Sequence, residues 1–420
     1  MAEIGDLVKI NDYEGILMPS DGKITIIKLS SGYNMAFKNA KINLIKKKEE
    51  VKKEKHGTIK KNPKLKNISI LHCGGTVASK VDYKTGGVTA QFAPDELLQL
   101  FPEIKDIANI ESKLIAQMMS ENMRFTHYNL IAKAIEEEIK KGVDGIIVTH
   151  GTDTLHYTSA ALAFMLENLP IPVLLVGSQR SSDRGSSDAA MNLISAISFI
   201  TNSDFGDVAI CMHAGTNDDD CLVLSATKTR KMHTSRRDAF RPINIKPYAR
   251  INYTTKEITY LNNNFKKRSN TKLKVMPFKE DLKIGLFKSH TNLYAEELDV
   301  YKNFDGLVVE GTGLGQLPNS VVDNSTEESG KIIEKIEELT KKIPVVMTSQ
   351  CVYGRIDMNV YSEGRINMGA GIIGNNLDMT PETAFIKLAW LLSNKLDVKE
   401  YFPKNLRGEI SERIENIFLI

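Results

Sequence analysis

Short runs of alternating hydrophobic and polar residues occupy the start of the chain. Turn-forming residues separate these runs, with Ser-Asp-Gly at 20–22 and Ser-Ser-Gly at 30–32. Alternation with a period of two is typical of half-buried strands. Residues 1–45 are therefore predicted to form a small β-barrel domain of the SH3-like kind. The runs are DLVKI (6–10), EGILM (14–18), KITIIKL (23–29) and YNMAF (33–37).

The pattern changes at Asn67, where mainly apolar runs begin to alternate with longer segments of helical periodicity, such as 126–141 and 153–167. This alternation is typical of βα units, which build a parallel sheet covered by helices. We therefore predict an α/β fold with two domains, at 67–260 and 261–420. The apolar runs are ISILH (68–72), GIIVT (145–149), VLLVG (173–177), DVAIC (207–211), KIGLF (283–287), DGLVV (305–309) and PVVMT (344–348).

A strongly basic segment separates the predicted barrel from the α/β region. Residues 46–66 carry ten lysines against three glutamates, although the whole chain has a net charge of only +3. So few apolar residues cannot bury a core, and the segment is predicted to be a linker. Two interpretations stay open: a solvated spacer, or a segment that attracts the phosphate backbone of a nucleic acid.

Composition narrows the class of protein. No apolar run approaches the roughly 18 residues of a membrane span, and the N-terminus lacks the apolar core of a signal peptide, so a cytoplasmic protein is expected. The cysteines show no metal-binding spacing, which favours a reducing compartment and predicts no metal site in this chain. They are Cys73, Cys211, Cys221 and Cys351.

Two strand ends carry the residues best suited to chemistry. The run 68–72 leads into Gly74-Gly75-Thr76, and the run 145–149 leads into Gly151-Thr152-Asp153. Ligands of parallel α/β sheets bind beyond the carboxyl ends of the strands, and paired glycines allow tight turns there. A threonine hydroxyl becomes a nucleophile only when a base removes its proton, and Asp153, a lysine or a histidine are candidates. Taken singly, these motifs also fit a plain turn and a helix N-cap.

Together the two motifs resemble the paired signatures of the bacterial-type asparaginase family, which are amidohydrolases with a threonine nucleophile. The resemblance covers roughly residues 67–395 and implies an asparaginase-like fold of two parallel-sheet domains. The segments that carry it are GGTVAS, MMSENM, THGTDTL, VLLVGSQR, VLSATKTRK and TSQCVYGRI.

The front domain, the charged linker, VDYKTGGV (81–88) and SSDRGSSDAAMNL narrow the resemblance to one branch, the D subunits of archaeal glutamyl-tRNA(Gln) amidotransferases. This resemblance implies a glutaminase that hydrolyses L-glutamine and passes the ammonia to an E subunit, which converts Glu-tRNA(Gln) to Gln-tRNA(Gln). It also implies a homodimer of this chain within an α2β2 heterotetramer, with ATP and Mg²⁺ in the partner and no cofactor in this chain. The alternatives are a free-standing cytoplasmic L-asparaginase and a non-catalytic RNA-binding or scaffold protein on the same fold.

The resemblance assigns the catalytic roles. Thr76 corresponds to the primary nucleophile, and Thr152, Asp153 and Lys228 correspond to the remaining members of the catalytic cluster. A lysine with a pKa near 10.4 is protonated at neutral pH, so Lys228 must be desolvated or lie near other cations to act as a base.

The resemblance also assigns substrate-binding roles. Ser120 and Glu121 correspond to the positions that hold the α-carboxylate and α-amino groups of the substrate, and Asp153 shares the second task. Tyr83 lies in the loop that closes over the substrate. The backbone amides around Gly75 or Gly151 are candidates for binding the oxyanion.

Overall fold

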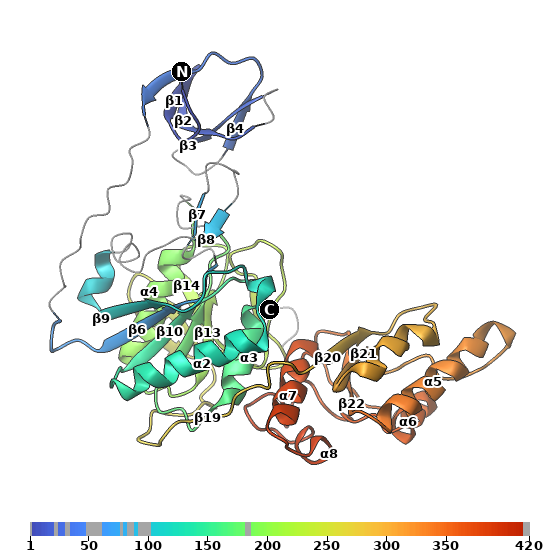
Figure 1. The fold of residues 1–420 in the computed structure, drawn as a ribbon. Coiled ribbons are helices and arrows are strands. Elements are labelled where there is room, and N and C mark those ends of the chain that lie inside the picture. The colour runs from blue at the N-terminus through green and yellow to red at the C-terminus, as the bar shows by residue number, and fades with distance from the viewer. Residues whose placement is uncertain are drawn as a thin grey trace.

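The computed structural model places a small all-β domain before two α/β domains (Figure 1). The strands of the small domain are β1 (Leu7–Ile10), β2 (Tyr13–Met18), β3 (Thr25–Leu29), β4 (Asn34–Phe37) and β5 (Asn43–Lys46), and they pair in the order β4-β3-β2-β1-β5. Every pairing in this sheet is antiparallel, which confirms the prediction of a small β domain. The structure describes residues 2–20, 24–29, 34–47, 61–75, 79–81, 88–90, 102–180 and 186–414.

The first α/β domain contains an eight-stranded sheet of order β18-β17-β14-β13-β12-β10-β6-β9. Five strands run parallel: β6 (Asn67–His72), β9 (Asn109–Leu114), β10 (Gly145–Thr149), β12 (Val173–Val176) and β13 (Val208–His213). The other three are antiparallel: β14 (Asp220–Ser225), β17 (Ala249–Asn252) and β18 (Ile258–Tyr260). The parallel sheet predicted from the apolar runs is present, and these three strands, which the sequence did not predict, extend it in the antiparallel direction. The loop between β13 and β14 is too short for the dozen or more residues of a parallel crossover.

Helices cover both faces of this sheet, and strand residues alternate between them. Ile146 and Val148 of β10 face α2 (Phe125–Lys140) and α3 (Leu155–Met165) within one hydrophobic core. Ile147 faces the opposite core, which contains α4 (Ala189–Asn202). Because the helices cover the faces of the sheet, they do not cover the carboxyl ends of its central strands.

The second α/β domain has a three-stranded parallel sheet, β20 (Ile284–Lys288), β21 (Gly306–Gly311) and β22 (Val345–Ser349). Its other elements are η4 (Ala295–Asn303), η5 (Asn324–Thr326), α5 (Glu327–Thr340), α6 (Ser362–Gly369), α7 (Pro381–Ser393) and α8 (Val398–Tyr401).

Each of the two Asp-Gly sequences before an apolar run has the same structural role. The Asp144 carboxylate accepts a hydrogen bond from Asn67 N at 2.8 Å, and the Asp305 carboxylate accepts one from Lys283 N at 2.8 Å. Each aspartate therefore fixes the start of the neighbouring parallel strand. The similarity of the two Asp-Gly sequences reflects this shared hydrogen bond.

Helix α7 joins the two α/β domains (Figure 1). It begins as its sequence predicts, because the Thr380 hydroxyl accepts a hydrogen bond from Thr383 N and Pro381 occupies the first turn. It contacts α3 on one side and strands β20 and β21 on the other, and the Phe164 and Trp390 rings lie 5.5 Å apart. One hydrophobic core therefore runs through both domains.

The first α/β domain also contains several short elements. They are β7 (Ser79–Val81) paired with β8 (Val88–Ala90), η2 (Pro102–Asp106), η3 (Ser120–Asn122), β11 (Leu166–Glu167) paired with β19 (Lys274–Val275), and β15 (Thr229–Lys231) paired with β16 (Phe240–Pro242). Within the part of the chain that the structure describes, no helix combines the length and apolar character of a membrane span.

Candidate active site

The two glycine-containing segments that were predicted to carry the chemistry, which we call the glycine corners, follow neighbouring strands of the sheet. Strands β6 and β10 are parallel neighbours, with Thr149 opposite His72 in the register. The Cys73 N–H donates to Thr149 O at 3.0 Å, and His72 Nδ1 lies 2.9 Å from Thr149 Oγ1. The segments that follow, 74–76 and 150–153, therefore start from adjacent points on the sheet edge.

The glycines of both corners are in close backbone contact. Gly75 has φ +82°, and a Cβ atom there would lie 2.4 Å from Gly151 N. A Cβ atom on Gly151 would lie 2.7 Å from the Ser120 Cβ. A larger residue at either position would force the segments apart, so Gly75, Gly151 and Ser120 lie in close contact. Gly75 directly precedes Thr76 in the chain.

The nucleophile candidate Thr76 lies outside the described residues, and so does Tyr83. The strands on either side of Tyr83, β7 and β8, are described and pair antiparallel as a hairpin.

The lysine that joins the cluster is Lys231. Its Nζ lies 2.9 Å from Thr152 Oγ1 and 2.7 Å from Asp153 Oδ1. Lys231 is the last residue of β15, and its side chain is only 10% exposed although Asp153 is largely open to solvent. Sequence reasoning missed this residue, yet it ends the same segment, VLSATKTRK, that contained the predicted lysine.

Lys228 is held elsewhere, so its prediction as a neighbour of Thr152 and Asp153 was wrong. Its buried Nζ lies 2.5 Å from Asp378 Oδ2 and also contacts the backbone oxygens of Asp378 and Glu409. Burial lowers the pKa of Lys228, and the Asp378 carboxylate opposes this effect. Lys228 lies in a bend just before β15 and Lys231 ends this strand, so the two side chains reach different surroundings.

The histidines and the cysteine at the corners have structural roles. Both ring nitrogens of His150 are occupied, with Nδ1 2.7 Å from Gly151 O and Nε2 2.8 Å from Thr158 Oγ1. Burial lowers the pKa of His150 and of His72 to about 4, so neither is positively charged at neutral pH. Burial raises the pKa of Cys73 to about 12, which keeps it a thiol and excludes a thiolate nucleophile.

The predicted substrate-binding turn lies next to the start of α3. Thr154 Oγ1 donates to Ser120 O at 2.6 Å, which fixes the short helix η3 beside residues 151–154. Ser120 is buried and Glu121 is exposed. A carboxylate is therefore available near the glycine corner, where it is open to an ammonium group.

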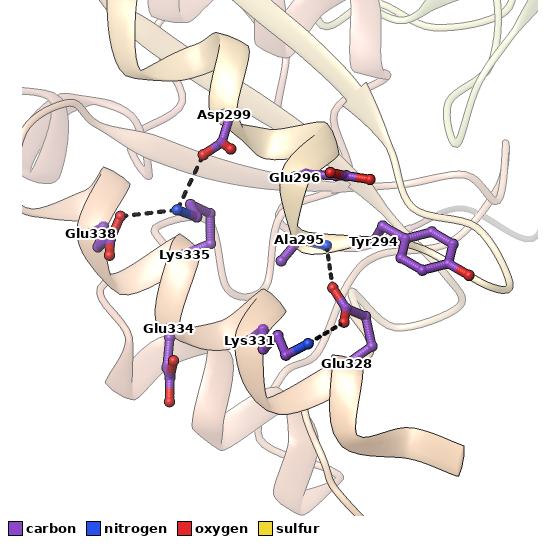
Figure 2. A pocket seen from close by; sticks show the side chains of 9 residues that line it. All are labelled: Tyr294, Ala295, Glu296, Asp299, Glu328, Lys331, Glu334, Lys335 and Glu338. Atoms are coloured by element: carbon purple, nitrogen blue, oxygen red, sulfur yellow. Dashed lines mark hydrogen bonds and ion pairs between the residues drawn. The ribbon is translucent and has the colours of Figure 1, made fainter. Parts of the chain in front are cut away.

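Two cavities differ in whether residues of the candidate active site line them. One, of about 410 Å³, is lined in part by Asp153 and Lys231. The other, of about 440 Å³, lies between η4 and α5 in the second α/β domain, far from any predicted site residue in sequence (Figure 2).

Ion pairs join some of the charged side chains that line the second cavity. Lys331 lies 3.0 Å from Glu328, and Lys335 lies 3.1 Å from Asp299 and 3.2 Å from Glu338 (Figure 2). The cavity is lined by five acidic side chains against two lysines, so a net negative charge remains there. Among the described residues, no group of three or more histidines, cysteines or acidic residues is placed to hold a metal ion.

Comparison with known proteins identifies the class. The model of the N-terminal domain of asparaginases matches residues 67–266, and that of the glutaminase/asparaginase C-terminal domain matches residues 283–401. The structure is similar to the thermostable L-asparaginase from Thermococcus kodakarensis, with a TM-score of 0.72 and 30% identity, over 83% of this chain and 100% of that one. It is also similar to L-asparaginase I from Vibrio cholerae, with a TM-score of 0.70 and 26% identity, over 83% and 99% of the two chains. Fold and site geometry therefore define an asparaginase-type α/β protein.

Full-length relatives identify the branch. The GatD N-terminal domain model matches residues 2–46. The D subunit of the glutamyl-tRNA(Gln) amidotransferase of Methanococcus maripaludis (strain C7) is 44% identical over 98% of this chain and 99% of its own length. Its counterpart from Pyrococcus furiosus is 43% identical over 100% of this chain and 97% of its own length. This chain belongs to the family of glutamyl-tRNA(Gln) amidotransferase D subunits.

Proposed function

We propose that this chain is the glutaminase component of a tRNA-dependent amidotransferase. It hydrolyses L-glutamine to glutamate and ammonia, and the ammonia converts Glu-tRNA(Gln) to Gln-tRNA(Gln) on a partner subunit. Full-length similarity to amidotransferase D subunits supports the pathway. The contact of Lys231 with both Thr152 and Asp153, beside the glycine corner that precedes Thr76, is the structural observation that carries the proposal.

In the proposed reaction the Thr76 hydroxyl attacks the side-chain amide carbon of glutamine. The carbon–nitrogen bond breaks, the nitrogen takes up the proton that the hydroxyl loses, and ammonia leaves a glutamyl ester on Thr76. Water then hydrolyses this ester, which releases glutamate and restores the hydroxyl. Splitting the reaction into two steps is the general advantage of nucleophilic catalysis.

Lys231 takes the catalytic role first assigned to Lys228. Its ammonium donates to Thr152 Oγ1 and is held by Asp153. A donor at that oxygen stabilises the negative charge that forms when Thr152 passes its proton to the reacting groups. Asp153 fixes Lys231 in position for this task, so the three side chains act as one unit.

The proposal extends to substrate binding. Ser120 and Glu121 would hold the α-carboxylate and α-amino groups, with Asp153 sharing the second contact. The amides of Gly75 and Gly151 would receive the oxyanion, and the β7–β8 hairpin would bring Tyr83 over the bound glutamine.

The assembly is part of the proposal. We expect an α2β2 heterotetramer in the cytoplasm, with a homodimer of this chain, a channel that carries ammonia to the E subunit, and ATP and Mg²⁺ bound by that subunit. Glu-tRNA(Gln) would be engaged through the complex. Glu363 is a candidate for completing the site of the neighbouring copy.

The variant Thr76→Val tests this function. We expect the complex with the E subunit to lose glutamine-dependent amidation of Glu-tRNA(Gln) and to retain amidation from added ammonium. Retained glutamine-dependent amidation would contradict the role of Thr76, and loss of both reactions would show that assembly depends on this residue. Rapid turnover of asparagine by the isolated chain would instead favour a free-standing asparaginase, the activity named for its structural neighbours.

A further inference from the structure

Glu382 occupies a buried position between two elements that adjoin the candidate active site. It lies in the first turn of α7, and its side chain is only 7% exposed. Arg230 Nη2 lies 2.9 Å from Glu382 Oε1, and His156 Nε2 lies 3.8 Å from the same oxygen. Arg230 comes from β15 and His156 from α3, so one oxygen atom of the second α/β domain faces two elements of the first.

Both of these elements carry or adjoin members of the proposed catalytic unit. Arg230 directly precedes Lys231, whose Nζ lies 2.9 Å from Thr152 Oγ1 and 2.7 Å from Asp153 Oδ1. Helix α3 begins two positions after Asp153. Glu382 therefore links the strand that carries the lysine to the helix that follows the lysine's two partners.

A neighbouring contact fastens the segment before β15 to the same turn of α7. The Thr383 hydroxyl donates a hydrogen bond to Thr227 O at 2.8 Å. Thr227 lies four positions before Lys231, whereas Arg230 is the residue next to it. The first turn of α7 therefore holds this segment at two points, and the ion pair with Glu382 is the point closer to the proposed catalytic lysine.

The environment of Glu382 keeps it a carboxylate. Burial raises its pKa, but the adjacent His156 ring and the charge of Arg230 outweigh burial, so that the net pKa lies below its ordinary value. A contact between a carboxylate and a guanidinium is charge-assisted, and when such a contact is buried, removing one partner leaves the other without compensation. The ion pair is therefore a strong link between α7 and β15.

We propose that Glu382 is a positioning residue for Lys231. This inference rests on the proposed glutaminase function, in which the Lys231 ammonium donates to Thr152 Oγ1. By holding Arg230 and the start of α3 together, Glu382 keeps β15 at the distance that this hydrogen bond requires. Glu382 acts through Lys231 and not by contact with the reacting atoms. A shift of about 1 Å in a catalytic group can cost about 100-fold in rate, so the loss of such a link is measurable.

The variants Glu382→Ala and Glu382→Gln test the link. Both contacts of Glu382 go to Oε1, so the amide oxygen of a glutamine accepts in the same place, whereas alanine offers no acceptor. The assay is glutamine hydrolysis by the complex with the E subunit, Glu-tRNA(Gln), ATP and Mg²⁺. We expect kcat to fall by about tenfold or more in Glu382→Ala and to stay within about threefold of the wild type in Glu382→Gln. Full kcat in Glu382→Ala would overturn the inference.

A double-mutant comparison shows whether Glu382 acts through Lys231. In the complex that carries Lys231→Met, we expect the addition of Glu382→Ala to lower kcat by less than about twofold, because the group that Glu382 positions is already absent. Enzyme concentrations are raised to keep the slower reactions measurable. A purely structural role would reduce kcat by the same factor in both backgrounds, and this result would overturn the inference.

Two further variants separate positioning from loss of stability. Glu409→Ala removes another buried ion pair of α7, that with Lys387, and should lower the unfolding temperature while kcat is retained. A loss of kcat in Glu409→Ala equal to that in Glu382→Ala would overturn the inference, since any weakening of α7 would then slow the reaction.

Arg230→Met removes the other end of the link, from a side chain that is partly exposed. We expect the same fall in kcat as in Glu382→Ala, so this variant decides the outcome if Glu382→Ala does not fold. An unchanged kcat in Arg230→Met would overturn the inference and leave the proposed function intact. A wild-type complex that does not hydrolyse glutamine would contradict the proposed function, on which the inference rests.

Discussion

At the residue scale, Lys228 and Lys231 show how position decides what one side chain does. They are three residues apart, yet one is buried against Asp378 and the other contacts Thr152 and Asp153. A buried lysine paired with a carboxylate contributes to folding, because removing either partner leaves an uncompensated charge. A lysine at the edge of a cavity is available for chemistry.

This difference predicts opposite effects of the same substitution. Lys231→Met should lower kcat/KM for glutamine hydrolysis by about 100-fold or more, the usual range for loss of a donor that stabilises a developing negative charge, and change stability little. Lys228→Met should destabilise the fold by about 3–5 kcal/mol, since it leaves Asp378 buried without its cation. Steady-state kinetics and urea unfolding of both variants make the comparison. A stable but inactive Lys228→Met would reverse the assignment.

The sequence predicted the site unevenly at this scale. Thr152 and Asp153 were identified from their place at a strand end, and the structure puts Gly75, Gly151 and Ser120 beside them. The lysine was not identified, because VLSATKTRK contains two lysines, and the bend before β15 that separates their directions does not show in the sequence. Which face of a short strand meets the cavity depends on β16 and on residues 378–409, far along the chain.

At the element scale, the site depends on two strand ends meeting with no side chain between them. Gly75 adopts φ +82°, and its backbone touches that of Gly151. Gly142, just after α2, also adopts φ +82°, but nothing lies within 4 Å of its would-be Cβ atom. The two positions therefore share backbone strain and differ in steric contact.

Alanine substitutions at these glycines separate the two effects. Gly142→Ala should cost about 1 kcal/mol from the left-handed conformation alone and retain full activity. Gly75→Ala should in addition displace the corner and reduce kcat/KM by about 100-fold, since a shift of about 1 Å in a catalytic group has that effect. Thermal unfolding and kinetics of both variants distinguish strain from displacement. Equal activity in the two variants would show that the close contact is not required.

Strands that are buried on both faces were easier to predict than strands at the side of the sheet. The apolar runs at 68–72 and 145–149 became central parallel strands, because a strand buried on both faces needs continuous apolar residues. Strands β17 and β18 were missed, since their segment is rich in polar residues and reads as a connection. They lie at the exposed side of the sheet, where the burial that produces a hydrophobic pattern is weaker.

At the scale of the whole molecule, the C-terminal segment fastens the two α/β domains together. The Glu409 backbone contacts Lys228, and Arg407 Nε donates to Ala163 O at 3.0 Å on helix α3. Lys387 of α7 forms a second buried ion pair with Glu409, at 2.5 Å. The hydrophobic periodicity of the sequence does not indicate such contacts. They join residues that lie in separate elements, in some cases more than a hundred positions apart.

The two glutamates near the C-terminal end of the chain provide a matched test of this fastening. Glu409 is fully buried, and its carboxylate accepts hydrogen bonds from Lys387 Nζ and from the backbone N–H groups of Leu406 and Arg407. Glu400 pairs with Lys404 at 2.7 Å on the surface, with both side chains about half exposed. Glu409→Ala should therefore cost about 3–5 kcal/mol and Glu400→Ala about 0–1 kcal/mol in the free energy of unfolding. Urea titrations measure both, and equal losses would mean that Glu409 does not fasten the C-terminal segment to the two domains.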